Sequence, residues 1–286
     1  MTLWIILTLN SIAMGGLLFL LSAGFSLIFG LMKIPNLTHG SFFMLGAYLG
    51  VTFLRLGFNF WIAAILAALV LALVGGLIER LLLRRLAGQE LAQVLVTLGL
   101  SFMLADICLL IWTGDPIPLP TPESLRGVVR IGDVVFPRYR IAVVVIAVFV
   151  ALVLWLILDR TRLGAMIRAG VDDPQMARVT GIRVSRLFTV VFSLGAALAG
   201  LGGVLAGPIL SVFPGLDAEM LPLALIIVIL GGAGSLFGAF LGSFIIGFIY
   251  NFGQAMFPEL AYVVLFLPML LVLVLRPQGL FGKQVL

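Results

Sequence analysis

The sequence contains two nearly identical stretches, GSFFMLGAYLG at residues 40–50 and GSLFGAFLG at residues 234–242. Removing two residues from the first copy leaves only two differences, both between large apolar side chains. Glycine fills 33 positions of this chain, so short matches between apolar segments also arise by chance. This match alone therefore does not decide whether the chain contains an internal repeat. The segments around the two matching stretches have to be compared.

The composition places the chain in a membrane. Hydrophobic residues make up 63% of the 286 residues and charged residues only 10%, with a mean hydropathy of +1.28. A soluble domain carries about 25% charged residues, so this chain lacks the polar surface that water requires. We expect a single transmembrane domain over residues 1–286. The net charge of +5 does not indicate nucleic-acid binding, because the basic residues lie in loops between apolar runs.

Single copies of cysteine and histidine limit the chemistry. With only Cys108 there is no disulfide framework, and with only His39 a histidine metal site is nearly excluded, so we expect no metal. No charge precedes Lys33, so the basic region of a cleavable signal peptide is missing. A membrane enzyme would need a cluster of polar residues inside the bilayer, and these residues do not supply one.

Eight apolar runs follow one another along the chain. A helix needs about 20 residues to span a bilayer, and most of the runs approach that length. They are Leu3–Met32, Ile34–Leu54, Phe60–Ile78, Leu91–Trp112, Ile141–Leu158, Leu187–Leu216, Met220–Pro258 and Leu260–Leu275. The fold class predicted is an all-α polytopic membrane protein with about eight transmembrane segments.

The basic residues predict the orientation, because cytoplasmic loops carry an excess of lysine and arginine. Twelve fall on one side: Lys33, Arg80, Arg84, Arg85, Arg160, Arg162, Arg168, Arg178, Arg183, Arg186, Arg276 and Lys283. Five fall on the other: Arg55, Arg126, Arg130, Arg138 and Arg140. We expect the twelve in the cytoplasm, with the N-terminus outside and the C-terminus inside.

The 39-residue run then has to enter the membrane and return, because a single crossing would move the C-terminus outside. Its first part, Met220–Leu230, reaches roughly 16 Å, about half of the hydrocarbon core. We expect GGAGS (231–235) to end the helix there. KIPNLT (33–38) is expected to end a helix in the same way, just before the matching stretch at residues 40–50. The sequence predicts two broken or re-entrant helix pairs with the same layout. Interrupted helices in corresponding halves point to a transporter's substrate path.

The repeated units are expected at about residues 10–112 and 140–275, joined by an extracytoplasmic loop over 113–140. Within that loop VVRIGDVVF (128–136) predicts a short hairpin, which either contacts a partner protein or caps the bundle. On the other side, residues 159–186 carry two short amphipathic helix patterns, with Asp172 or Asp173 as a cap. This segment is either a docking site for a cytoplasmic partner or an ordinary basic loop; its caps and apolar face favour docking.

Several segments resemble the permeases of branched-chain amino-acid ABC importers, the Liv-type systems. The resemblance covers residues from about 10 to 282. It rests on Asn36–Gly40 (N-x-x-H-G), GAY at 46–48, VTLGLS at 96–101, LGAMIRAGVDDPQMARVTGI at 163–182, LGAALAGLGGVLAG at 194–207, GGAGSLFGAFLG at 231–242 and LRPQGLFG at 275–282. The Glu-Ala-Ala triplet of other ABC importers is absent from 172–182, which weakens any comparison with that loop.

The resemblance implies an importer subunit for branched-chain or other hydrophobic amino acids in the inner membrane of a bacterium. This chain would be the shorter of two paired permeases, in a heterodimer with a second homologous permease. It would work with two ATP-binding subunits that use ATP and Mg, and with an extracytoplasmic substrate-binding protein. No GxxxxGK[ST] motif occurs, so we expect no enzymatic activity and no cofactor in this chain.

Candidate residues fall into two sets. Those for the substrate path are Asn36, His39, Gly40, Ser41, Thr97, Ser101, Asp106, Gly231, Gly232, Gly234 and Ser235. Those for ATPase coupling are Leu163, Met166, Ile167, Arg168, Asp172, Asp173, Pro174, Met176, Ala177, Gly181 and Ile182.

Structural roles compete with transport at several of these positions. Asn36 and His39 are expected mainly to support the helix break, and Thr97 and Ser101 to pack helices. Asp106 either holds a substrate's ammonium group or pairs with an outer arginine. Two alternatives for the whole chain remain, a passive channel for a small polar solute and a permease of the same family for urea, an amide or another amino acid.

Overall fold

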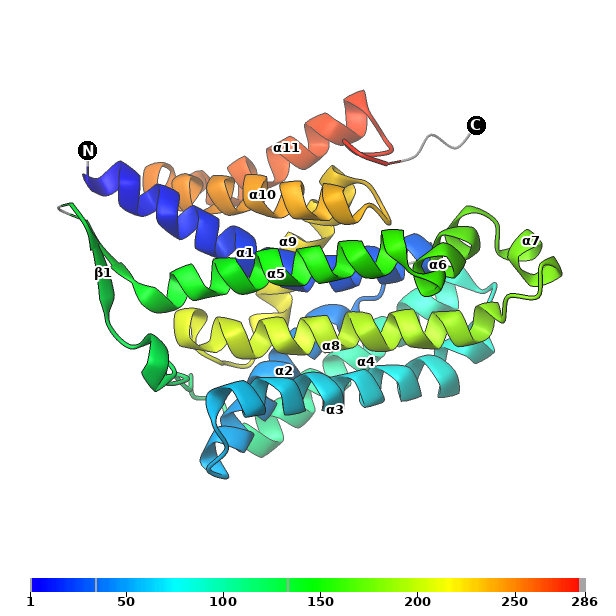
Figure 1. Ribbon diagram of the computed structural model, residues 1–286, viewed down its shortest axis with the longest axis horizontal. Helices are drawn as coiled ribbons and strands as arrows, with labels where there is room; N and C mark the ends of the chain where they lie inside the picture. The colour runs from blue at the N-terminus through cyan, green and yellow to red at the C-terminus, as the bar shows by residue number, and fades with distance from the viewer. Residues whose placement is uncertain (1, 34, 133, 283–286) are drawn as a thin grey trace.

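The structure is a computed structural model that describes residues 2–33, 35–132 and 134–282. Its long helices are α1 (Thr2–Met32), α2 (Thr38–Arg55), α3 (Phe60–Leu81), α4 (Glu90–Trp112), α5 (Arg138–Arg160), α8 (Val184–Leu210), α9 (Leu216–Gly231), α10 (Leu236–Met256) and α11 (Ala261–Leu275). Helices α3, α5, α8 and α10 run along the long axis of the molecule, whereas α9 crosses behind them (Figure 1). Six of the long helices, α1, α3, α4, α5, α8 and α10, are long and apolar enough to cross a membrane. The expectation of an all-α polytopic membrane protein is confirmed.

Both predicted helix breaks are present. One helix ends at Met32 and the next begins at Thr38; likewise one ends at Gly231 and the next begins at Leu236. The pairs differ in length, however. In the first pair a 31-residue helix precedes one of 18 residues, whereas in the second a 16-residue helix precedes one of 21. The two breaks therefore occur where the common layout predicts them, but the helix lengths of the two pairs differ. Helix α9 begins before Met220, and α10 is long enough to span the membrane on its own.

Helix α1 is the centre of the bundle. In its most apolar stretch 89% of the residues are buried, against 17% in α4 and in α5. Glycines on α8 allow neighbouring helices to approach at backbone distance. A Cβ at Gly46 of α2 would lie 2.4 Å from Gly200 Cα, and one at Gly24 of α1 would lie 2.6 Å from the Gly195 carbonyl oxygen. The glycine-rich run 196–207 is thus a packing surface, as small residues between membrane helices usually are.

The two ends of the bundle differ. The N-terminus and the hairpin of β1 (Val128–Ile131) and β2 (Val134–Pro137) lie at one end, with Val128 paired antiparallel to Pro137 (Figure 1). The short helices α6 (Arg162–Asp172) and α7 (Pro174–Val179) lie at the other end (Figure 1). The predicted hairpin and the two predicted amphipathic helices are confirmed. Lys283, counted above among the cytoplasmic charges, lies outside the described residues.

Short 3-10 helices complete the connections. They are η1 (Leu83–Leu86) between α3 and α4, η2 (Glu123–Leu125) before the hairpin, and η3 (Pro258–Leu260) before α11. The C-terminal segment 276–282 returns to the bundle and packs on the end of α9. Leu280 N–H donates to the Leu230 carbonyl at 2.8 Å and Phe281 N–H to the Gly231 carbonyl at 3.1 Å. Carbonyls at a helix end lack partners within the helix, so this segment caps α9.

Candidate translocation and coupling sites

Helices α2 and α4 are joined by polar contacts at three levels. Thr38 Oγ1 donates to the Thr97 carbonyl oxygen at 2.9 Å, and the hydroxyl oxygens of Ser41 and Ser101 are 2.8 Å apart. Near the C-terminal end of α4, Trp112 Nε1 donates to Thr52 Oγ1 at 2.9 Å. The predicted path residues Thr97 and Ser101 therefore face α2. Of the two roles considered for them, helix packing is the one these contacts describe.

Asp217 joins this polar contact from the first turn of α9. Ser41 Oγ donates to Asp217 Oδ2 at 3.0 Å, and because Ser41 has a single hydroxyl hydrogen, the Ser101 hydroxyl donates to Ser41. Ser101 is the central residue of α4, so the three side chains meet near the middle of that helix. Gly40 permits the approach, since a Cβ there would lie 2.7 Å from the Asp217 carbonyl oxygen. We call Ser41, Ser101 and Asp217 the central cluster.

Sequence reasoning missed Asp217. It did not include this acid among the candidate path residues, whereas the structure buries it and hydrogen-bonds it to Ser41 of α2. The three ion pairs found among the described residues involve Glu79, Glu123 and Asp159, and none includes Asp217. Only two acids, Asp217 and Glu219, interrupt residues 187–258, but this local pattern does not show which of them the neighbouring helices bury.

Asn36 and His39 support the first break. Asn36 Oδ1 accepts a hydrogen bond from the Thr38 N–H at 3.2 Å, and His39 Nε2 lies 2.9 Å from the Leu21 carbonyl oxygen of α1. Both side chains are buried, and the His39 ring packs on Phe25 with centroids 5.3 Å apart. These contacts fit the structural role that the sequence favoured. Asn36 Nδ2 and His39 Nδ1 have no hydrogen-bond partner within the described part of the chain.

Asp106 lies on the exposed face of α4. Gly99, two helical turns earlier, is on the same side, and a Cβ added there would meet no neighbouring atom within 4 Å. A carboxylate facing lipid at this depth is costly, and an exposed glycine on a membrane helix is typical of a helix–helix interface. The exposed face of α4 is therefore suited to a second protein or to a polar path.

The second break is packed against the rest of the bundle. Gly232 and Gly234 have φ angles of 97° and 78°, which favour glycine, and the Ser235 hydroxyl caps α10 by accepting from Gly238 N–H at 3.0 Å. A Cβ at Gly30, near the end of α1, would lie 2.4 Å from Gly234 Cα. The two breaks are therefore neighbours in space, although Gly231 itself lies against Gly238 rather than in an open path.

At the opposite end from the hairpin, α6 is fixed to the end of α5. Gly164 is required there, because a Cβ would lie 2.0 Å from the Leu158 carbonyl oxygen. Arg168 bonds to that carbonyl and, at 3.2 Å, to Asp159. Ile167 is buried, and the predicted apolar face of α6 packs on the core through Leu163 and Met166. This helix is held against the bundle.

Helix α7 has the predicted caps. Asp173 Oδ1 accepts from the N–H groups of Gln175 and Met176 at 2.8 and 3.0 Å, and Pro174 takes the first helical position. Gly181 has φ +86°, and Ile182 N–H donates to the Ala177 carbonyl at 3.0 Å, a Schellman ending.

Two apolar side chains of α7 point away from the protein. Met176 is 59% exposed and Val179 is 81% exposed, whereas Ala177 is buried. Figure 1 shows α7 at the far end of the molecule, beyond the ends of the long helices. Both side chains are therefore available for contact with a second protein.

Comparison with known proteins gives the family. Residues 7–273 match the family described as the branched-chain amino acid transport system / permease component. The chain belongs to this family. It is 29% identical to the high-affinity branched-chain amino acid transport system permease protein BraD of Pseudomonas aeruginosa, over 96% of this chain and 94% of BraD. It is 28% identical to the permease protein LivH of the corresponding system in Escherichia coli K12, over 96% of this chain and 94% of LivH.

The solved structure of PsaBC from Streptococcus pneumoniae in complex with Fab resembles this permease in fold. The TM-score is 0.50 at 13% sequence identity, over 93% of this chain and 89% of that one. The chain is thus a permease subunit of the ABC importer class, with apolar helices suited to membrane spans.

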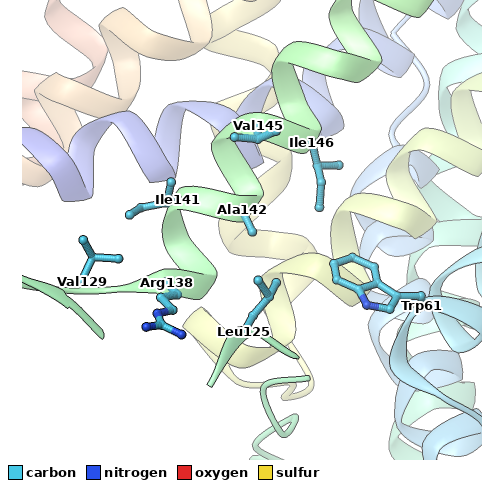
Figure 2. Close-up of a pocket in the computed structure, with 8 residues that line it drawn as sticks. All are labelled: Trp61, Leu125, Val129, Arg138, Ile141, Ala142, Val145 and Ile146. Carbon is cyan, nitrogen blue, oxygen red and sulfur yellow. The ribbon is translucent and has the colours of Figure 1, made fainter. Parts of the chain in front are cut away.

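One hollow of about 380 Å³ opens at the hairpin end of the permease. In Figure 2 its walls come from the start of α5, Val129 of the hairpin, Leu125 of η2 and Trp61 of α3, and apart from Arg138 the side chains are apolar. None of its lining residues is a predicted path residue or a member of the central cluster. This hollow therefore does not serve as the candidate substrate site.

Proposed function

We propose that this permease forms half of the translocation path of an ATP-driven importer for branched-chain or other hydrophobic amino acids. The second half is a homologous permease in a heterodimer. Two ATP-binding subunits hydrolyse ATP with Mg, and an extracytoplasmic binding protein delivers the substrate. This chain itself has no ATPase activity and carries no cofactor.

The observation that best supports a polar path is the central cluster. Ser41, Ser101 and Asp217 place one carboxylate and two hydroxyls near the middle of α4, where lipid alone would disfavour them. An amino acid is a zwitterion with an ammonium and a carboxylate group. The Asp217 carboxylate suits the ammonium group. The positive end of the α2 helix dipole, near Gly40, suits the carboxylate, although the Thr38 and His39 N–H groups already donate to Asn36.

The exposed face of α4 supplies the place for the second permease. Asp106 lies on this face, so the path runs along α4 between the two subunits, with Thr97 and Ser101 on its inner side. The breaks between Met32 and Thr38 and between Gly231 and Leu236 adjoin this path and permit the subunit to change shape. Gly232 and Gly234 act here as backbone joints rather than as substrate ligands.

Coupling to the ATPases takes place through α6 and α7. Met176 and Val179 enter a groove of the ATPase, while Leu163, Met166 and Ile167 hold α6 on the core. Arg168, Asp172, Asp173, Pro174, Ala177, Gly181 and Ile182 maintain the shape of this segment. The α6–α7 end and the C-terminus then lie in the cytoplasm of a bacterial cell, and the N-terminus lies outside the inner membrane.

The test is to purify the tagged chain from native membranes in mild detergent and to identify what accompanies it by mass spectrometry. Recovery of a second permease and an ATP-binding subunit would support the proposal. A homo-oligomer without any ATPase would contradict it and favour a passive channel. Binding of urea or an amide by the associated extracytoplasmic protein, in place of amino acids, would overturn the substrate assignment alone.

A further inference from the structure

An ion pair between buried Glu79 and partly exposed Arg84 lies at the inner corner between α3 and α4. Glu79, at the end of α3, is only 1% exposed, and its carboxylate accepts from Arg84 Nη2 at 3.0 Å and from Arg84 Nε at 3.4 Å. A third donor comes from another part of the chain, since Thr189 Oγ1 of α8 donates to Glu79 Oε2 at 2.6 Å. Glu79 and Arg84 are five residues apart, and Thr189 follows more than 100 residues later.

Arg84 extends this contact to the beginning of α8. Its Nη2 atom also donates to the Ser185 carbonyl oxygen at 2.9 Å. Ser185 is the second residue of α8 and follows Ile182, the last of the ATPase-coupling candidates, by three positions; we call residues 163–182 the coupling segment. The Arg84 guanidinium therefore binds the first turn of α8, which directly follows the coupling segment.

The α3–α8 contact above the ion pair is too tight to slide. A Cβ at Gly75 would lie 2.5 Å from Ala196 Cβ, and one at Gly76 would lie 2.5 Å from Ser193 Oγ. Packed contacts of this kind move as a unit, because interiors are close-packed and small shifts create clashes or voids. A displacement of α8 is thus passed to the end of α3 and to Arg84.

A second set of hydrogen bonds leads from this corner to α4. Gln93 Nε2 of α4 donates to the carbonyl oxygens of Leu83 and Leu86 in η1, at 3.1 and 3.0 Å. Gln93 lies one turn before Thr97 and two turns before Ser101 on the same helix. Among the helices of the described chain, α4 packs mainly on α2, so η1 is its principal attachment at the inner end.

We propose that Glu79, Arg84, Thr189 and Gln93 form a relay that transmits the movement of the coupling segment through η1 to α4. The inference rests on the proposed function for its ATPase partner, though not for the amino-acid substrate. These are positioning residues, which act through α4 and touch no substrate. Because Glu79 is buried, its carboxylate is strongly disfavoured without the donors from Arg84 and Thr189, whereas the Arg84 side chain is partly exposed.

The experiment follows α4 directly in the complex purified with its ATPases. An environment-sensitive fluorophore is attached at Leu110→Cys, an exposed position near the outer end of α4, and its signal is compared without nucleotide and after trapping with ATP and vanadate. The native cysteine, Cys108, is buried and is replaced by Ser. Leu110→Cys/Cys108→Ser is the parent for Glu79→Gln, Thr189→Val and Gln93→Met.

We expect the nucleotide-dependent signal of the parent to fall about 5-fold or more in each relay variant, while the complex still assembles and hydrolyses ATP. Thr189→Ser, which keeps the hydroxyl, should restore the signal. Arg126→Gln, which breaks the exposed outer pair with Glu123, should leave it unchanged. An undiminished signal in the relay variants, or no signal in the parent, would overturn the relay. Neither result depends on which solute is carried, so failure of the amino-acid assignment is measured separately by uptake.

Discussion

The Ser41 hydroxyl donates a 3.0 Å hydrogen bond to the Asp217 carboxylate across 176 positions of sequence. This bond connects the helix after the first break with the helix before the second break. It also places a carboxylate, for which the described residues provide no ion-pair partner, near the middle of a membrane bundle. A buried acid inside a membrane is most often retained for function, because its burial is costly.

Asp217→Asn tests the charge of the central cluster. Asparagine keeps an acceptor for Ser41 and removes the charge, and an interaction with a charged group contributes about 1.5–3 kcal/mol. We expect amino-acid uptake to fall by roughly tenfold or more, with normal membrane insertion. Glu219→Gln removes the neighbouring exposed acid and is the control. Normal uptake by Asp217→Asn, measured at equal expression, would show that the charge serves no transport step.

Met176→Asp and Val179→Asp test the exposed face of α7. A carboxylate at either position opposes burial of apolar surface against the ATPase, so less ATPase should be recovered with the purified permease. Val135→Asp on the hairpin is the control, since Val135 is comparably exposed at the other end of the molecule. If the α7 variants retain the ATPase as fully as Val135→Asp does, the docking assignment is wrong.

Gly181→Val tests the ending of α7. The space around Gly181 is open, but its φ of +86° costs a β-branched residue at least about 1–2 kcal/mol. We expect ATP-driven uptake to decrease more than membrane insertion does. Gly57→Val is a matched control, with φ +87° and open space near the outer end of α2. Equal uptake by the two variants, measured per inserted molecule, would count against a special role for the α7 ending.

Gly203→Ala tests the backbone contact between α2 and α8. The added Cβ would lie 1.9 Å from the Phe43 carbonyl oxygen, and overpacking of this kind costs about 1–3 kcal/mol. The thermal midpoint of the purified permease should drop. Gly253→Ala on α10 should keep or raise it, because a Cβ there would lie 3.5 Å from Val264 Cγ1, an ordinary contact, and alanine is the better helix former by about 0.5–1 kcal/mol. An unchanged midpoint in Gly203→Ala would contradict the packing account.

The helical fold could be predicted because each apolar run and each break leaves a local signal. KIPNLT and GGAGS ended helices where the structure ends them, and Asp173 with Pro174 predicted the start of α7. Helix length was less predictable, because α9 begins at Leu216 in a segment where apolar residues continue through the turn. Hydropathy does not mark where such a turn lies.

The contacts between distant residues left no comparable signal. Asp217 and Glu79 each follow an apolar run and resemble ordinary loop charges, yet both are buried by partners more than 100 residues away. Arg84 was interpreted only as a marker of orientation, although it also pairs with Glu79 and reaches α8. Tertiary packing decides these roles, and a pattern along one segment cannot show which acid its neighbours will enclose.

The measurement that tests the central claim most directly is uptake of labelled leucine by liposomes containing the permease with its copurified partners and the binding protein. The account predicts accumulation that requires internal Mg-ATP hydrolysis and stops with a non-hydrolysable analogue. Leucine that only equilibrates across the bilayer, at the same rate with and without ATP, would contradict the account and identify a passive pathway.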